Sequence, residues 1–250
     1  MREDQLEGRN VVIEALRRQR RRVHRVFLDE RAKRNPKIAQ LMELIAQHNV
    51  PLRRVSRQHL DKMSATGVHN GVIALAAPLP AYTVQSRLDA VFNDGEYPFF
   101  VLGDELNYEH NLGAILRSAM GAGAHAVVVP VKRGKGVTPV VQRVAMGGAE
   151  EVPVIREGIS SSLVTLKRAG VPIIGADMDG APYWTVPMVG PLAIVLGGEN
   201  KGLTHTVRKK CDVIVGVPLM SNLESLNVSV TAGILMFEKR RQEVAQAKDG

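Results

Sequence analysis

Short apolar runs alternate with stretches of helical periodicity along most of the chain. In the C-terminal two thirds these runs are rich in Val and Ile and only four or five residues long, as is typical of strands buried on both faces of a parallel sheet. The predicted strands cover residues 98–102, 126–130, 152–155, 171–175, 193–196 and 213–217. Helical periodicity fills most of the segments between them and the end of the chain. The pattern predicts an α/β domain with a parallel sheet covered by helices.

The first third of the chain predicts a smaller α/β unit. Alternating residues predict strands over 23–28 and 50–55 and a third ending near residue 75, and helical periodicity predicts helices over 11–16 and 35–48. Asn10 precedes the first helix and is predicted to cap it. Residues 1–77 are therefore expected to form a domain of their own.

Turn-forming residues separate this domain from the larger one. Pro78, Pro80 and the run Asn93-Asp94-Gly95 predict a linker over residues 78–95, in which residues 84–92 have some helical character. The larger domain is then expected to span residues 96–250.

Two polar loops follow predicted strands near the C-terminal end. Gly197-Gly198-Glu199-Asn200 comes directly after the strand at 193–196, and the loop 220–227 follows the strand at 213–217. Ser225 and Asn227 in this loop are well placed to start the last helix. The carboxyl ends of parallel strands meet at one edge of a sheet, where open α/β proteins bind ligands. Glycines at such a turn let a ligand approach the backbone closely. Short motifs of this kind are also common as plain turns and helix caps, so these loops by themselves identify no ligand.

Charge is distributed unevenly along the 250 residues. The formal net charge is +8, and residues 1–77 hold sixteen Lys and Arg against eight Asp and Glu, whereas the remainder is balanced. Such an excess is typical of a surface that neutralises phosphates, so we expect the first domain to bind nucleic acid. A solvated basic face is the alternative explanation. The predicted RNA-binding residues are Arg17, Arg18, Arg20, Arg21 and Arg22, with Lys132, Arg133 and Lys135 in a basic loop of the second domain.

Several classes of protein are disfavoured by the sequence. No apolar run approaches the length of a membrane span, and the charged start of the chain lacks the apolar core of a signal peptide. The single cysteine, Cys211, fits a reducing cytoplasm and is expected to pack inertly. His69 has no partner at metal-ligand spacing, so no metal site is expected. The glycines of residues 121–126 follow a helix and enter a strand, the reverse of a dinucleotide-binding loop, which argues against a nicotinamide-dependent oxidoreductase.

Three motifs in order resemble the SpoU (TrmH) family of RNA ribose methyltransferases. They are Asn111-Leu-Gly-Ala-Ile-Leu-Arg117, then Gly197-Gly-Glu-Asn-Lys-Gly202, then a strand with Val217-Pro-Leu219 followed by Ser225-Leu-Asn-Val-Ser229. Residues 66–75 resemble the end of the small substrate-binding domain, similar to a ribosomal protein fold, that precedes the catalytic domain in many members. The resemblance implies a C-terminal trefoil knot in the sheet, S-adenosylmethionine as cofactor, RNA as partner and a homodimer.

The same resemblance implies where the cofactor binds. Residues expected at its pocket are Ala176, Gly197, Gly198, Val217, Leu219 and Leu226. They would offer backbone contact and apolar packing around the adenine, for which small and aliphatic side chains suffice.

The catalytic residues implied by the motifs are Asn111, Arg117, Glu199, Ser225 and Asn227. A ribose hydroxyl is a poor nucleophile near neutral pH and must lose its proton during attack. Arg117 is assigned as the base in relatives, yet a guanidinium rarely gives up its proton in a protein. The alternative is that Arg117 binds the adjacent phosphate while Glu199 or water takes the proton. Residues 107–110 stand where an aspartate-proline dipeptide is common before the first motif, so the sequence does not determine the shape of that loop.

The sequence therefore predicts a two-domain RNA 2′-O-methyltransferase of the cytoplasm. Its size and domain order are most similar to the enzymes that methylate a guanosine ribose in large-subunit ribosomal RNA. A transfer RNA methyltransferase is the first alternative, although such members usually carry short helical extensions instead of a separate domain. A non-catalytic RNA-binding or assembly protein is the second alternative, and it predicts loss of Arg117, Glu199 or Asn227, all of which are present.

Overall fold

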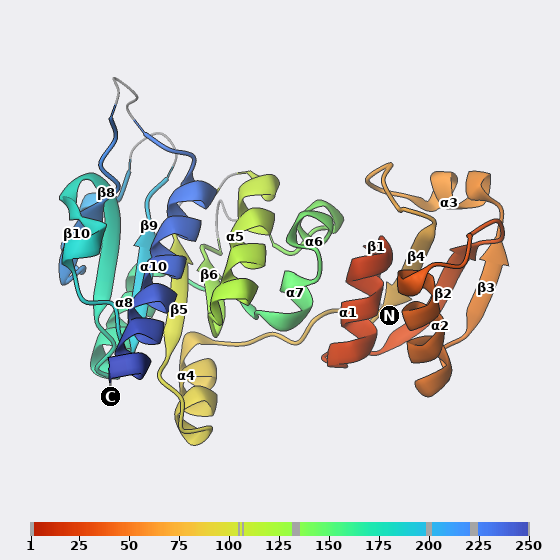
Figure 1. Ribbon diagram of the computed structural model, residues 1–250, viewed down its shortest axis with the longest axis horizontal. Coiled ribbons are helices and arrows are strands. Elements are labelled where there is room, and N and C mark those ends of the chain that lie inside the picture. The colour runs from red at the N-terminus through yellow and green to blue at the C-terminus, as the bar shows by residue number, and fades with distance from the viewer. Residues whose placement is uncertain are drawn as a thin grey trace. The chain divides into compact units, whose positions relative to one another are not determined.

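Two β-sheets, each with its own helices, organise the chain in the computed structural model (Figure 1). The structure describes residues 3–104, 106, 108–131, 136–198, 202–220 and 225–249. Two units are distinguished by their internal contacts: an N-terminal unit of residues 1–81 and 137–151, and a C-terminal unit of residues 82–136 and 152–250. Within the described residues, no helix has the length and apolar character needed to cross a membrane.

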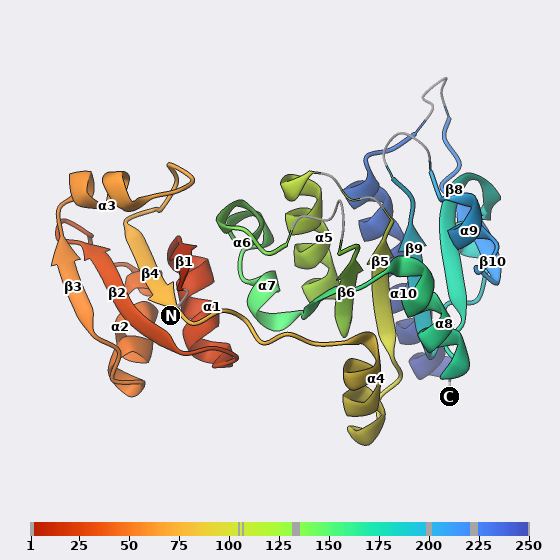
Figure 2. The same cartoon turned by 180° about the vertical axis from the view of Figure 1, so that it is seen from behind.

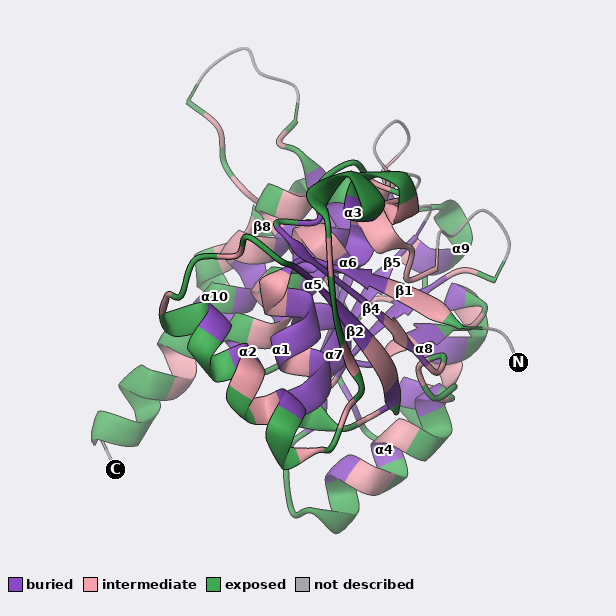
Figure 3. Ribbon diagram, turned by 90° about the vertical axis from the view of Figure 1, so that its right-hand side faces the viewer, coloured by how far each residue is buried: buried purple, intermediate pink, exposed green. Residues whose placement is uncertain are grey.

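The N-terminal unit is built on a four-stranded sheet with the order β1-β4-β2-β3. Its elements are β1 (Asp4–Glu7), α1 (Arg9–Arg18), β2 (Val23–Asp29), α2 (Pro36–Gln47), β3 (Leu52–Val55), α3 (Arg57–Met63), β4 (Val72–Ala76), α6 (Pro139–Ala145) and α7 (Gly148–Glu151). Apolar residues of α1 and α2 pack on one face of this sheet. The short α3 packs on the other face through Leu60, which meets Phe27 and Ile73. Partly buried Val55, Met63 and Leu75 pack against this small contact, and most of α3 is exposed (Figure 3).

The start of α1 differs from the prediction. Gly8, at a φ of 101°, occupies the capping position. Only glycine adopts such a backbone conformation without strain, which is why the helix begins there. Asn10 is the second residue of the helix, and its side-chain oxygen accepts a hydrogen bond from Lys37 Nζ at 2.7 Å. The strand β1 and the helix α3 were not predicted, because each is short and has no clear apolar period.

The division of the chain also differs from the prediction. Residues 137–151, which we expected in the second domain, belong to the N-terminal unit. The expected linker of residues 78–95 contains a full helix, α4 (Val84–Asn93), which a Thr83–Ser86 capping box initiates. Val84 and Leu88 lie in the core of the C-terminal unit, so this helix is part of that unit rather than a linker. Sequence composition marks turns well but does not reveal which segments share a core.

The C-terminal unit contains the predicted parallel sheet, with six strands in the order β10-β8-β9-β5-β6-β7 and every neighbouring pair parallel. The strands are β5 (Phe99–Gly103), β6 (Ala126–Val129), β7 (Val154–Arg156), β8 (Ile173–Pro182), β9 (Leu192–Leu196) and β10 (Val213–Gly216). The remaining elements are α5 (Glu109–Ala122), α8 (Ile159–Arg168), η1 (Tyr183–Thr185), α9 (His205–Arg208) and α10 (Val228–Asp249). Helices α5 and α10 cover one face of the sheet, and α4, α8 and α9 cover the other (Figures 1 and 2).

Strand β8 is longer than predicted, because it continues through Asp177 to Pro182 instead of ending near residue 176. Its pairing with β10 shifts register between Ile214 and Val215. A side chain at Gly180 would overlap the backbone of Val215, so the two strands approach closely only because Gly180 has no Cβ. The extension carries polar residues, and the apolar pattern that predicted the strand therefore stopped too early.

Cys211 has the inert environment that its neighbours predicted. Its thiol is half-buried and lies 3.4 Å from the carbonyl oxygen of Val207. Burial, aided by the Asp212 carboxylate, raises the pKa of Cys211 to about 11. Because the thiolate is the reactive form, we expect iodoacetamide at pH 8 to label the native protein on the order of a hundredfold more slowly than the urea-unfolded chain. Mass spectrometry of timed samples measures this, and equal rates would contradict it.

Candidate active site at the carboxyl edge of the sheet

The carboxyl ends of β5 and β9 lie side by side and are hydrogen-bonded to each other. These neighbouring strands are in register to their last residues, where Gly103 pairs with Leu196. One residue further, the backbone N–H of Asp104 donates to the Leu196 carbonyl at 2.9 Å. The loop before α5 and the glycine-rich turn after β9 therefore start from the same point, as the parallel sheet predicted.

The glycine-rich turn folds back on itself. Gly198 and Gly202 exchange two backbone hydrogen bonds, of 2.9 and 3.1 Å. A side chain at Gly197 would overlap the backbone of Gly202 and Leu203, so glycine is required for the closure of the turn. The predicted catalytic residue Glu199 lies outside the described residues.

Asp104 anchors the segment that follows this turn. Its buried carboxylate accepts from Thr204 Oγ1 at 2.8 Å and from the Thr204 backbone N–H at 3.3 Å. At the other end of α9, Arg208 donates to Asp177 at 2.9 Å and to Asp179 at 2.8 Å. These carboxylates, Asp179 first, raise the pKa of Arg208. The turn is thus fixed to β5 and to β8.

Sequence reasoning did not select these anchoring residues. A signal existed for Asp104, which stands directly after the predicted strand 98–102 at the ligand-binding edge. Its partner Thr204 is distant in sequence, and only the fold brings them together.

The first and third motifs meet through two asparagines. Asn227 Nδ2 donates to Asn111 Oδ1 at 3.1 Å. Asn111 is buried in the first turn of α5, and Asn227 also caps α10 through a 2.9 Å bond from the Ser229 N–H to its Oδ1. The predicted helix-starting role of Asn227 is confirmed. Amide side chains assigned separately to the active site thus form one hydrogen-bonded pair.

Arg117 lies on the exposed side of α5, six residues or about one and two-thirds turns beyond Asn111. None of the described carboxylates pairs with its guanidinium. Ser225 is exposed as well and stands two residues before Asn227. Both side chains are therefore accessible for a polar substrate.

The predicted cofactor residues lie on three adjacent strands, β8, β9 and β10, and in the segments that follow β9 and β10. Ala176 is buried on β8 and pairs with Leu196 at the end of β9. The others are partly exposed at strand ends and in the loops that follow, namely Gly197, Gly198, Val217, Leu219 and Leu226. The fold thus brings the strand-end residues of this set to one edge, with apolar surface that is not fully covered. No group of three or more potential metal-binding side chains occurs in the described part of the chain.

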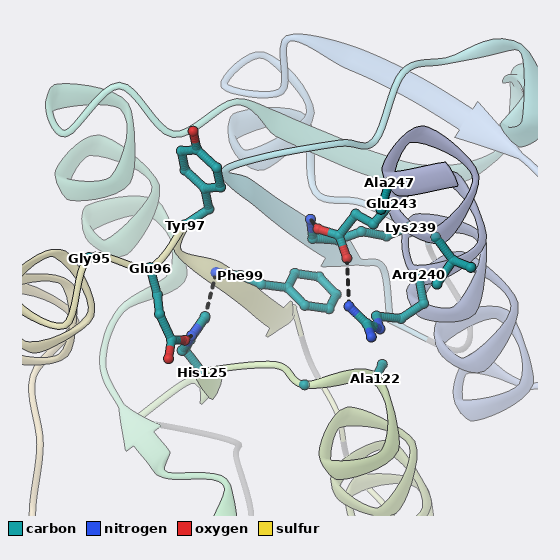
Figure 4. Close-up of a pocket in the computed structure, with 12 residues that line it drawn as sticks. Gly95, Glu96, Tyr97, Phe99, Ala122, His125, Lys239, Arg240, Glu243 and Ala247 are labelled. Carbon is teal, nitrogen blue, oxygen red and sulfur yellow. Dashed lines mark hydrogen bonds and ion pairs between the residues drawn. The ribbon is translucent and has the colours of Figure 1, made fainter. Parts of the chain in front are cut away.

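A cavity of about 530 Å³ lies at the opposite edge of the sheet, where β5 begins (Figure 4). Its lining includes Glu96, Tyr97, Phe99, His125, Lys239 and Arg240. The buried Lys239 ammonium lies over the Phe99 ring and is bonded to Glu243 and to the Gly190 carbonyl at 2.7 Å. Since Lys239 is fully occupied by protein groups and the motifs are remote along the strands, we assign no function to this cavity.

Arg21 does not have the surface position that an RNA contact requires. Its side chain is fully buried, pairs with the buried Glu150, and reaches Asp4 at 2.9 Å. Burial raises the pKa of Glu150, and the charge of Arg21 acts in the opposite direction. Arg20 donates to the Glu150 carbonyl oxygen at 3.0 Å. These bonds hold residues 137–151 to the N-terminal unit.

The neighbouring arginines are also largely engaged within the unit. Arg17 and Arg18 both contact Glu14, and Arg18 also pairs with Glu151 at 2.6 Å. Arg22 is exposed, and within the described ranges no carboxylate pairs with it. Lys132, Arg133 and Lys135 lie outside the described residues.

Comparison with known proteins identifies the family. Residues 98–237 match the model of the SpoU rRNA Methylase family, and residues 5–82 match a model described as RNA 2′-O ribose methyltransferase substrate binding. The chain belongs to the SpoU rRNA methylase family. This SpoU assignment confirms what the three motifs predicted.

Relatives in the SpoU family match over most of their length. The chain is 37% identical over 205 residues to the 23S rRNA (guanosine-2′-O-)-methyltransferase RlmB of Pectobacterium atrosepticum, and the match covers 81% of this chain and 83% of that protein. It is 34% identical over 241 residues to YacO of Bacillus subtilis, named as a TrmH family tRNA/rRNA methyltransferase, with 96% of each chain covered. A crystal structure of an RNA 2′-O ribose methyltransferase matches with a TM-score of 0.78 and 28% identity, over 96% of this chain and 89% of that one. AviRb of Streptomyces viridochromogenes, in complex with AdoMet, shares the fold with a TM-score of 0.79 and 23% identity, over 97% and 91%.

Proposed function

We propose that this protein transfers a methyl group from S-adenosylmethionine to the 2′-hydroxyl of a guanosine ribose in 23S ribosomal RNA. The observation that carries the proposal is the bond between Asn111 and Asn227, which joins the first and third motifs at the carboxyl edge of the sheet. RlmB, whose name states this reaction, is similar over most of the chain.

The residues at the edge fit the cofactor. The turn at Gly197 is closed so tightly that a side chain there would overlap Gly202 and Leu203, and glycines in such a turn let a ligand approach the backbone closely. Val217, Leu219 and Leu226 offer incompletely covered apolar surface nearby, which suits an adenine ring. When bound, the cofactor supplies an electrophilic methyl group on a sulfonium. Ala176, Gly197 and Gly198 would complete the pocket.

The remaining motif residues would act on the ribose. The accessible Arg117 guanidinium is suited to bind the phosphate beside the target ribose, which favours loss of the hydroxyl proton during attack. Glu199 or water would accept that proton. Asn111 and Asn227 hold α5 and the start of α10 together, and Ser225 is near enough in sequence to Asn227 to contact the substrate.

The finer features of the family are part of the proposal. A trefoil knot in the C-terminal unit is supported by membership of the SpoU family and is compatible with the close approach of β8 and β10 at Gly180, where a side chain is excluded. A homodimer is supported by Val230, Phe237 and Val244, which are exposed at seven-residue intervals along α10. Sedimentation at the monomer mass of 27.3 kDa would contradict the dimer. Because the proposed substrate is ribosomal RNA, we expect the protein to act in the cytoplasm.

Tritium transfer from labelled S-adenosylmethionine tests the reaction. Purified protein is incubated with 23S ribosomal RNA and with transfer RNA, and each product is hydrolysed with alkali. Label in an alkali-resistant dinucleotide of 23S RNA is expected, because a methylated 2′-hydroxyl cannot assist cleavage. Label on transfer RNA only would overturn the substrate, and binding without transfer to either RNA would favour the non-catalytic alternative.

Asp104→Ala tests whether the anchored turn forms the cofactor site. Both bonds from Thr204 would be lost, and a hydrogen bond to a charged group contributes about 1.5–3 kcal/mol. We expect the dissociation constant of S-adenosylmethionine, measured calorimetrically, to rise about tenfold. The matched control is Asp179→Ala, which removes an exposed partner of Arg208 and should change it less than about twofold. Equal effects of the two changes would contradict a specific role of Asp104.

A further inference from the structure

The arginines of the N-terminal unit fall into two groups that the sequence does not distinguish. Arg17, Arg18 and Arg21 are paired with carboxylates of the same unit. By contrast, among the described residues no carboxylate pairs with Arg53 or Arg54. A paired arginine must break its ion pair with the carboxylate before it can bind a phosphate. An exposed unpaired arginine releases only counterions. The unpaired group is therefore the better phosphate-binding set.

Strand β3 places its two arginines at an open edge of the sheet. It is the outermost strand next to β2, and Arg53 and Arg54 pair in register with Phe27 and Leu28. Both arginine side chains are exposed. Because successive residues of a strand alternate between faces, Arg53 lies on the face that carries α3 and Arg54 on the face that carries α2.

Further arginines surround this edge. Arg25 lies two residues before Phe27 on β2 and therefore on the α3 face of the sheet. Helix α3 contributes one fully buried residue, Leu60, to that face. Arg57 begins α3, is two-thirds exposed, and is 3.9 Å from Asp29. That long separation leaves its guanidinium largely free.

The loop after β2 adds another arginine to the same edge. The backbone N–H of Glu30 donates to the Val55 carbonyl at 2.9 Å, and the Arg31 N–H donates to Asp29 Oδ1 at 2.9 Å. Arg31 is thereby fixed beside the start of α3, with its side chain exposed. The exposed carboxylates close by in sequence are Glu30 and Asp61, of which Asp61 pairs with His69. Positive charge predominates on this surface.

We propose that the β3 surface, defined by Arg25, Arg31, Arg53, Arg54 and Arg57, binds the phosphate backbone of the RNA substrate, and that the paired arginines Arg17, Arg18 and Arg21 do not. This inference rests on the proposed function for its choice of partner. Charged side chains also protect an edge strand from pairing with another chain. That role accounts for Arg53 and Arg54 on β3, but it does not require Arg31 and Arg57, which lie outside the strand.

Two double substitutions with equal charge change test the inference. Arg53→Gln/Arg54→Gln removes the strand arginines, and Arg17→Gln/Arg18→Gln removes the paired ones. Binding of full-length protein to in vitro transcribed 23S ribosomal RNA is measured by filter binding at several KCl concentrations without cofactor. We expect the first variant to bind on the order of tenfold more weakly, with the slope of log K against log [KCl] reduced by about 2. The second should change affinity less than about twofold.

Two further variants protect the test against misfolding. Arg53→Lys/Arg54→Lys should restore most of the affinity, because phosphate attraction depends chiefly on charge. Arg31→Gln/Arg57→Gln changes residues outside the strand and should also weaken binding about tenfold. Equal or larger losses in the Arg17/Arg18 variant would overturn the proposal. Unchanged affinity in both glutamine variants of the β3 surface would also overturn it. If light scattering then showed aggregation of the Arg53→Gln/Arg54→Gln variant, these arginines would only protect the edge strand.

The outcome is independent of catalysis. If the variants differ in RNA affinity as expected but the wild-type protein transfers no methyl group, the β3 surface stands and the proposed function fails. If it methylates 23S RNA and the pattern is reversed, only the β3 surface is wrong.

Discussion

Arg117→Ala will reduce methyl transfer to 23S ribosomal RNA about a thousandfold while leaving the fold and cofactor binding intact. The loss is expected because a guanidinium at the target phosphate stabilises charge that develops during attack, which an alanine cannot do. The fold should persist because Arg117 is exposed and pairs with none of the described carboxylates. Single-turnover transfer of labelled methyl groups and calorimetric binding of S-adenosylmethionine measure the two quantities separately.

Arg168→Ala is the matched control for this prediction. Arg168 is also an exposed helical arginine of the C-terminal unit, but it ends α8 shortly before β8 begins, at the edge of the sheet opposite the motifs. Its replacement should leave the transfer rate within about twofold, as for surface changes elsewhere. A thousandfold loss in both variants would mean that the effect is not specific to Arg117.

Arg117→Lys separates the two roles considered for this residue. If Arg117 were the base, lysine would shift the pH–rate profile to lower pH, because an ammonium loses its proton more readily than a guanidinium. If Arg117 binds phosphate, the rate should fall through the loss of bidentate geometry and the profile should keep its shape. We expect the second result.

Glu150→Ala will destabilise the N-terminal unit by about 3–5 kcal/mol. The change leaves the Arg21 guanidinium fully buried with the partly exposed Asp4 as its one carboxylate partner among the described residues, and an incompletely compensated buried charge is costly. Since residues 137–151 meet the rest of the unit at this ion pair, their attachment should weaken too. Native-state hydrogen exchange of the β2 amides measures the free energy of unfolding of this unit.

Two companion variants show whether burial is the cause. Arg21→Met/Glu150→Met removes both charges and should cost far less than Glu150→Ala, since apolar residues can replace a buried ion pair with little loss. Arg18→Ala breaks the exposed pair with Glu151 and should cost less than about 1 kcal/mol. A large loss in the double variant would point to packing rather than charge.

Local patterns predicted the strands and the ligand-binding edge well. Each strand of the C-terminal sheet coincides with a short apolar run, because strands buried on both faces must be apolar throughout. The polar extension of β8 beyond residue 176 was missed for the same reason. Asn227 was placed correctly as a helix start, because capping depends on residues adjacent in sequence.

The sequence by itself determined the family, the parallel sheet and the position of the motifs at its carboxyl edge, because these depend on local periodicity and on residues that stand close together along the chain. Tertiary structure decided which charges are available. Arg21 and Arg53 look equivalent in the sequence, yet one is buried against Glu150, 129 residues away, and the other is exposed on an edge strand. The link between Asp104 and Thr204 is of the same kind. Whether an arginine faces a carboxylate or solvent depends on distant segments that only the fold brings together.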